Sequence, residues 1–167
     1  MQRTRFSAMR CSLARSLDRI GDWWTPLILR DLFLGVTRFD ELVEDLGLSR
    51  NLLARRLRSL VARGLVRKVP YQRRPLRHAY LLSAAGEALL PPLLALTAWG
   101  DRHAAPPGGP PLRFRHLGCG RDFVPVVVCS CCGEALEAAA VEARPGPGGA
   151  AARGTRVVAR RLATKAR

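Results

Sequence analysis

Four of the five cysteines of this 167-residue chain fall within Cys119–Cys132, a clustering that indicates metal chemistry rather than a disulfide scaffold. Cys129 and Cys132 form a Cys-x-x-Cys pair followed by glycine, and His116 and Cys119 form a second short pair. Two such pairs can supply the four ligands of a tetrahedral Zn²⁺ site, which is structural rather than catalytic when all four positions are filled by protein. The spacing therefore predicts that His116, Cys119, Cys129 and Cys132 bind zinc.

Cys131 leaves the ligand assignment open, because it could replace a neighbouring cysteine. A disulfide within the cluster and a set of free thiols are the other two interpretations of this pattern. A segment of about 30 residues cannot build a stable core alone, so a bound metal would supply the missing folding free energy.

The arginines between Arg50 and Arg63 have the chemistry of nucleic-acid recognition. Leucines recur at helical spacing in the same segment, which predicts that one face is buried and that the arginines lie on the other. Arginine can bond guanine O6 and N7 together, and further arginines would neutralise phosphates. The alternative interpretation is that this segment is an ordinary helix whose arginines face solvent and contact no nucleic acid. The expected DNA contacts are Ser49, Arg50, Asn51, Arg55, Arg56 and Arg58 in the helix and Arg73, Arg74 and Arg77 in the turn that follows.

The hydrophobic pattern of residues 1–103 predicts the elements that position these side chains. In chain order they are helices over 11–20, 26–34, 38–46 and 50–63, strands over 65–70 and 77–82, and a last helix from 84 to 99. Ser49 and Ser83 are the expected caps, and Pro91 and Pro92 are expected to break or kink the last helix near its middle. The acidic face of the third helix is expected to point away from the phosphates. This order predicts a mainly α fold with a small β-wing, a winged helix-turn-helix.

Composition divides the rest of the chain. Residues 104–111 are a Pro/Gly linker, 112–143 a cysteine-rich, ribbon-like extension, and 144–167 a basic segment that we expect to be disordered. The net charge of +15 points to an anionic partner such as nucleic acid. No apolar run is long enough for a membrane span, and the first ten residues lack a secretion signal, so we expect a cytoplasmic protein associated with the nucleoid.

Over about residues 11–103 the chain resembles the HxlR-type winged-helix transcriptional regulators. The resemblance rests on Gly21-Asp22-Trp23-Trp24-Thr25, Arg38-Phe39-Asp40-Glu41-Leu42, Gly64-Leu65-Val66 and Trp99-Gly100. It implies a homodimeric bacterial transcription factor, usually a repressor, that dimerises through its first and last helices. Cysteine-containing tails occur on some members.

The resemblance also implies a role for Cys11, because some members use a cysteine just before the first helix as a redox sensor. Arg10 and Arg15 are close in sequence and would favour its thiolate. The alternative is a small buried apolar side chain. Trp23 and Trp24 are expected to pack in the core or in the gap between the wing and the helices, and the alternative is that they line an effector pocket.

Together these features predict a sequence-specific DNA-binding regulator, a repressor acting as a homodimer on a pseudo-palindromic operator. No phosphate-binding loop and no Ser–His–Asp-like set occurs in the sequence, so we expect no enzyme. The alternative is an RNA-binding or ribosome-associated basic protein with a zinc ribbon.

Overall fold

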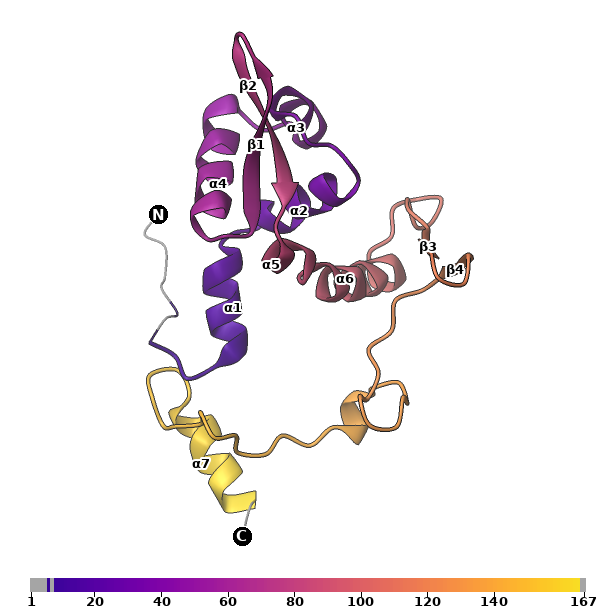
Figure 1. Cartoon of the computed structure of the whole chain (residues 1–167). Helices are drawn as coiled ribbons and strands as arrows, with labels where there is room; N and C mark the ends of the chain where they lie inside the picture. The colour runs from indigo at the N-terminus through magenta and orange to yellow at the C-terminus, as the bar shows by residue number, and fades with distance from the viewer. Residues whose placement is uncertain (1–5, 7, 166–167) are drawn as a thin grey trace. The chain divides into compact units, whose positions relative to one another are not determined.

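The computed structural model describes residue 6 and residues 8–165 (Figure 1). The chain divides into two compact units. One unit joins residues 1–27 with residues 139–167, and the other runs from residue 28 to residue 138. The helices are α1 (Ser12–Ile20), α2 (Trp24–Phe33), α3 (Phe39–Leu46), α4 (Arg50–Ala62), α5 (Ala84–Glu87), α6 (Leu90–His103) and α7 (Arg156–Lys165), with a 3-10 turn at Ala138–Ala140. The strands are β1 (Val66–Arg73), β2 (Leu76–Leu82), β3 (Phe114–His116) and β4 (Arg121–Phe123).

The helix-turn-helix is built from α3 and α4, as the hydrophobic pattern predicts. Leu42 of α3 and Leu53 and Leu57 of α4 are fully buried, together with Ile28 and Leu29 of α2. Gly47 ends α3 in the left-handed region at φ 61°, which lets the chain turn sharply toward α4. The leucines of α4 are thus locked in the core, and this fixes which side of that helix faces outward.

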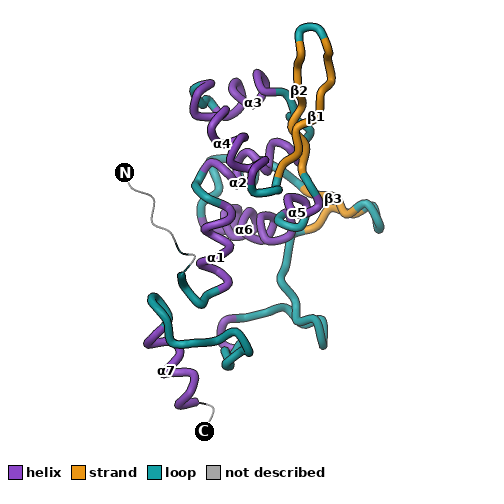
Figure 2. Tube along the Cα trace, turned by 60° about the vertical axis from the view of Figure 1, so that its left-hand side comes forward, coloured by secondary structure: helices purple, strands orange, loops and turns teal. Residues whose placement is uncertain are grey.

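The wing is the antiparallel hairpin of β1 and β2, and Figure 2 shows that it projects beyond the helices beside it. Its strands are longer than predicted, since only Arg74 and Pro75 separate them. The backbone N–H of Tyr80 donates to the Thr37 carbonyl at 2.8 Å, and Arg38 forms an isolated β-bridge with Ala79. These bonds join the wing directly to the start of α3.

The predicted last helix is two helices. α5 ends at Glu87, and α6 begins at Leu90 with Pro91 and Pro92 in its first turn. The prolines therefore lie where their missing N–H groups cost nothing, and the break comes before them rather than at mid-helix. The 14 residues of α6 are mixed in polarity, and no helix in the described part of the chain is long and apolar enough to cross a membrane.

The expectation of a disordered segment over residues 144–167 is wrong for its second half, where α7 forms. The glycines and prolines of this segment end at Gly154, and the residues after it are arginine, alanine, leucine, valine and threonine with one lysine. Such a run favours a helix once the helix breakers are passed. The buried Thr155 precedes α7, and its hydroxyl donates to the Ala150 carbonyl at 3.1 Å.

The expectation that both tryptophans pack in the core or between the wing and the helices is also wrong in part. Trp24 is half-buried, whereas Trp23 is 92% exposed. Trp23 lies in the loop between α1 and α2, where the Asp22 carboxylate accepts a hydrogen bond from the backbone N–H of Trp24, the first residue of α2, at 2.9 Å.

Asp31 is a buried carboxylate inside α2, and it makes the stability of the fold depend on pH. Its side chain pairs with Arg30 at 2.6 Å, while its second oxygen, Oδ2, is buried without a hydrogen-bond partner among the described residues. Burial raises the pKa of Asp31 above its ordinary value, against the lowering effect of Arg30. The folded state therefore binds this proton more tightly than the unfolded state does.

We expect the wild type to lose stability relative to Asp31→Asn as the pH rises from the ordinary aspartate pKa through the raised one. In that window the folded protein binds more protons than the unfolded chain, so its free energy of unfolding falls with pH, and the asparagine does not titrate. Urea denaturation of both proteins across a pH series measures the difference. A difference that stays constant with pH contradicts the prediction.

Candidate nucleic-acid interface

The outer face of α4 carries three exposed polar side chains that a binding partner could contact. Ser49 caps the helix by accepting a hydrogen bond from the Leu52 backbone N–H at 3.3 Å, as predicted. Asn51, Arg55 and Arg58 are exposed on the side away from the buried leucines. These three point outward because the core fixes the opposite face of the same helix.

Two other arginines of α4 lie differently. Arg56 is half-buried, so it lies at the edge of the outer face. Arg50 forms an ion pair with Asp40 at 2.7 Å and lies over the ring of Phe39, 5.1 Å from its centre. Asp40 of the acidic α3 therefore contacts the first residue of α4, and the expectation that this acidic face points away from the phosphates stays a prediction.

The wing places its arginines at its tip. Arg73, Arg74 and Arg77 are exposed, and Arg77 lies opposite Gln72 in the strand register. The Gln72 amide donates to the Arg74 carbonyl at 3.0 Å, which braces the turn. The tip therefore presents three cations on a supported hairpin.

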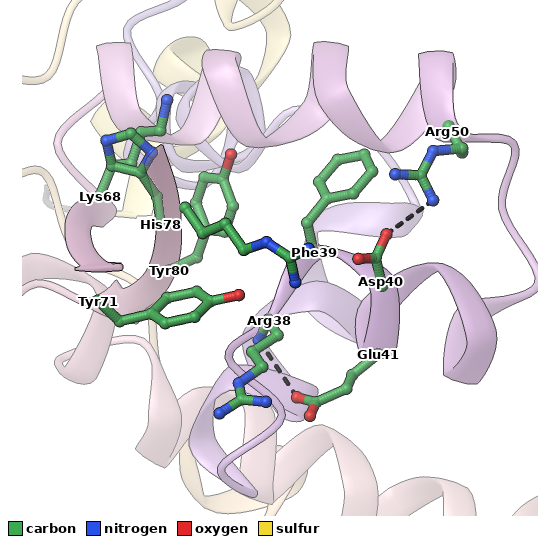
Figure 3. A pocket seen from close by; sticks show the side chains of 10 residues that line it. Arg38, Phe39, Asp40, Glu41, Arg50, Lys68, Tyr71, His78 and Tyr80 are labelled. Carbon is green, nitrogen blue, oxygen red and sulfur yellow. Dashed lines mark hydrogen bonds and ion pairs between the residues drawn. The ribbon is translucent and has the colours of Figure 1, made fainter. Parts of the chain in front are cut away.

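Sequence reasoning missed four residues of this surface. Arg38, Lys68, Tyr71 and His78 line a hollow between the wing and the starts of α3 and α4 (Figure 3). The guanidinium of Arg38 lies 5.1 Å from the centre of the Tyr71 ring. Alternation along the strand could have indicated that Lys68 is exposed. The hollow as a whole could not be predicted in this way, because the bridge between residues 38 and 79 joins segments that are distant in sequence.

The sequence model of HxlR-like helix-turn-helix proteins matches residues 19–107, which is more than half of the chain. The chain belongs to the HxlR-like helix-turn-helix family. The matched range contains α2 to α6, and so it covers the helix-turn-helix and the wing.

Relatives and solved structures agree with this HxlR-like assignment. The chain is 44% identical over 137 residues to an uncharacterized HTH-type transcriptional regulator of Mycobacterium tuberculosis, covering 82% of this chain and 87% of that protein. The crystal structure of PA1607, a candidate transcription factor, is 37% identical with a TM-score of 0.71, covering 81% and 95% of the two chains. The reduced form of the redox regulator HypR is 28% identical with a TM-score of 0.52, covering 55% and 92%. The chain therefore carries the DNA-binding fold of a transcriptional regulator, and these relatives are named as regulators rather than enzymes.

The HxlR-like match ends before the cysteine-rich extension, which contains two tight turns of the same form. Strands β3 and β4 pair as a hairpin with Cys119 in its turn, where the Gly120 N–H donates to the His116 carbonyl at 2.8 Å. In the second turn the Gly133 N–H donates to the Cys129 carbonyl at 2.9 Å. Both glycines have positive φ, at 68° and 77°. Each predicted ligand pair thus spans one turn closed by a glycine.

The backbone N–H groups of the second turn favour the thiolate form of Cys129. The backbone N–H groups of Cys132 and Cys131 lower the pKa of Cys129 to about 7, and the Cys131 nitrogen lies 3.4 Å from the Cys129 sulfur. The two turns do not converge, however. Within residues 8–165 no group of three or more His, Cys, Asp or Glu side chains lies close enough together to hold a metal ion.

Cys11 lies in the other unit, at the amino end of α1. It is half-buried with a free thiol, and Arg10 and Arg15 beside it are exposed. Its backbone carbonyl accepts from the Arg15 N–H at 3.0 Å, so Cys11 is the N-cap of α1.

Proposed function

We propose that this protein is a sequence-specific transcriptional repressor that reads base edges with α4 and contacts phosphates with its wing. One observation carries the proposal: Asn51, Arg55 and Arg58 face outward from a helix whose other face is locked in the core. Residues near the amino end of such a helix enter the major groove furthest, and arginine and asparagine recognise guanine and adenine there. The wing tip, with its three exposed arginines, supports phosphate contacts beside that groove.

A homodimer would place two copies of α4 on a pseudo-palindromic operator. Exposed apolar side chains of α6 support this state, because Leu96 and Trp99 are 58% and 59% exposed and lie three positions apart on one face of the helix. Large apolar side chains gathered on one helix face favour a protein partner. A two-fold dimer would then read two half-sites about one helical turn apart. The proposed place of action is the nucleoid in the bacterial cytoplasm.

Genome-wide DNA occupancy of the tagged full chain tests the proposal. We expect enrichment of one inverted-repeat motif, and we expect affinity for that duplex to fall steeply with salt. Transcription of the neighbouring gene should rise when the protein is deleted. Enrichment without any shared motif, or a fall in transcription on deletion, contradicts the proposed repressor.

We infer that His116, Cys119, Cys129 and Cys132 bind one structural zinc ion, which would draw the two turns of the extension together. The matching form of the two turns supports the site, as do the backbone N–H groups of Cys131 and Cys132 that favour the Cys129 thiolate. Zinc per chain should fall from about one to about zero in Cys129→Ser and should persist in Cys131→Ser. Metal analysis of the purified proteins measures this, and intact protein without zinc rules the site out.

The basic segment containing α7 should add affinity for DNA of any sequence. Residues 144–167 hold seven basic residues and no acidic one, and among the described residues Arg156, Arg160 and Arg161 make no ion pair. Replacing these three by glutamine should weaken binding to non-operator duplex and reduce the slope of log affinity against log salt by up to about 3. The footprint on an operator should keep its boundaries. An unchanged salt slope would show that α7 does not contact DNA.

The redox role of Cys11 stays a prediction. Its place at the start of α1 and the similarity of the chain to the redox regulator HypR support it.

A further inference from the structure

The hollow between the wing and the helix-turn-helix is large enough for a small molecule. It has a volume of about 470 Å³, and its walls come from three places: the start of α3, the first residue of α4, and both strands of the wing. Ligand sites in proteins commonly measure about 300–1,000 Å³. The backbone bonds from Thr37 and Arg38 to β2 hold the walls together, so the hollow is preformed.

The lining carries an excess of positive charge. Four cationic side chains, those of Arg38, Arg50, Lys68 and Arg77, face two carboxylates, those of Asp40 and Glu41. Asp40 already neutralises Arg50 at 2.7 Å. Lys68 and Arg77 make no ion pair with any described residue. A single negative charge on a ligand would therefore find unpaired cations here.

Aromatic rings form the remaining walls. Figure 3 shows Phe39, Tyr71 and Tyr80 among the side chains that line the hollow, with Arg38 beside the Tyr71 ring. In Figure 3 the Tyr71 hydroxyl points in among the lining side chains, where it can donate a hydrogen bond to an anion. Rings of this kind favour stacking with a planar ligand.

We propose that this hollow binds a small aromatic carboxylate, which competes with DNA for the wing and α4. The carboxylate pairs with Lys68 and Arg77, and the ring lies among Phe39, Tyr71 and Tyr80. A bound anion places negative charge next to Arg50 and the wing, where phosphates would otherwise lie. This regulatory consequence rests on the proposed DNA-binding function, whereas ligand binding itself does not.

Three probes with the full-length chain separate the contributions in isothermal titration. Benzoate has both the charge and the ring, cyclohexanecarboxylate has the charge without an aromatic ring, and benzamide has the ring without the charge. We expect benzoate to bind with a Kd on the order of 0.1–1 mM, benzamide at least about tenfold more weakly, and cyclohexanecarboxylate in between. Benzoate should also bind about tenfold more weakly to Arg77→Gln and Tyr71→Leu, but equally to Arg102→Gln, which removes an exposed cation on α6.

Competition is measured on an operator duplex. Benzoate should release the duplex, and the concentration needed should rise with the DNA concentration. The binding proposal is overturned if benzoate shows no saturable binding up to about 10 mM. It is also overturned if acetate binds as tightly as benzoate, because the hollow would then be an anion-binding site that does not recognise the aromatic ring. Benzoate binding that leaves duplex affinity unchanged overturns the competition. If benzoate binds but no duplex does, the proposed function fails and the ligand site stands.

Discussion

Replacing Arg55 by alanine is expected to relax the choice of operator bases, whereas replacing Arg74 is expected to weaken binding to every duplex by a similar factor. Arg55 is exposed on the outer face of α4, opposite the fully buried Leu53 and Leu57. A bidentate contact from arginine to guanine contributes about 1–3 kcal/mol of discrimination, which is roughly 5- to 150-fold in affinity. Arg74 lies at the wing tip, where a phosphate contact carries no base information.

The measurement is a comparison of binding to the operator and to its single-base variants for the wild type and both substituted proteins. Arg55→Ala should reduce operator affinity while some variant bases become equally acceptable. Arg74→Ala should keep the order of preference and lower the salt slope by about 1. If Arg55→Ala leaves specificity and affinity unchanged, α4 does not read bases.

Gly86→Ala is expected to destabilise the winged-helix unit strongly. Gly86 is buried in α5, directly after the wing, and a Cβ there would overlap the backbone carbonyl oxygen of Leu65. That oxygen also accepts a hydrogen bond from the Ser83 N–H at 3.1 Å, and the Ser83 hydroxyl donates to the Gly64 carbonyl at 2.6 Å. Because backbone on both sides is held, the clash cannot be relieved by a side-chain rotation.

Overpacking of this kind costs about 1–3 kcal/mol or more, a large part of the stability of a typical domain. Gly100→Ala is the matched control, because its Cβ would point into open space within α6. There alanine should be neutral or stabilise the helix by up to about 1 kcal/mol. Thermal unfolding followed by circular dichroism should show opposite shifts in Tm. Equal Tm values for Gly86→Ala and the wild type would show that the two segments are not in contact.

Local signals predicted most of the helix-turn-helix. Ser49 accepts the predicted capping bond, and the leucine spacing of α4 identified its buried face. Both depend on residues within a few positions of one another, where helix geometry leaves little choice. For this reason the outer face of α4 could be named from the sequence.

Features that depend on distant segments were not predictable in the same way. The bridge between Arg38 and Ala79 and the ion pair between Asp40 and Arg50 join elements that sequence periodicity treats separately. The hollow they enclose was therefore missed. α7 was missed for a different reason, because averaging over residues 144–167 mixes a Gly/Pro-rich half with a helix-forming half.

A footprint of the full chain on its occupied duplex tests most directly whether α4 reads DNA. We expect two protected half-sites with centres about 10 base pairs apart, and methylation of one guanine in each should weaken binding by the wild type by roughly 5- to 150-fold per half-site but not change binding by Arg55→Ala. Uniform protection without half-sites, or preferential binding to structured RNA, would contradict the account.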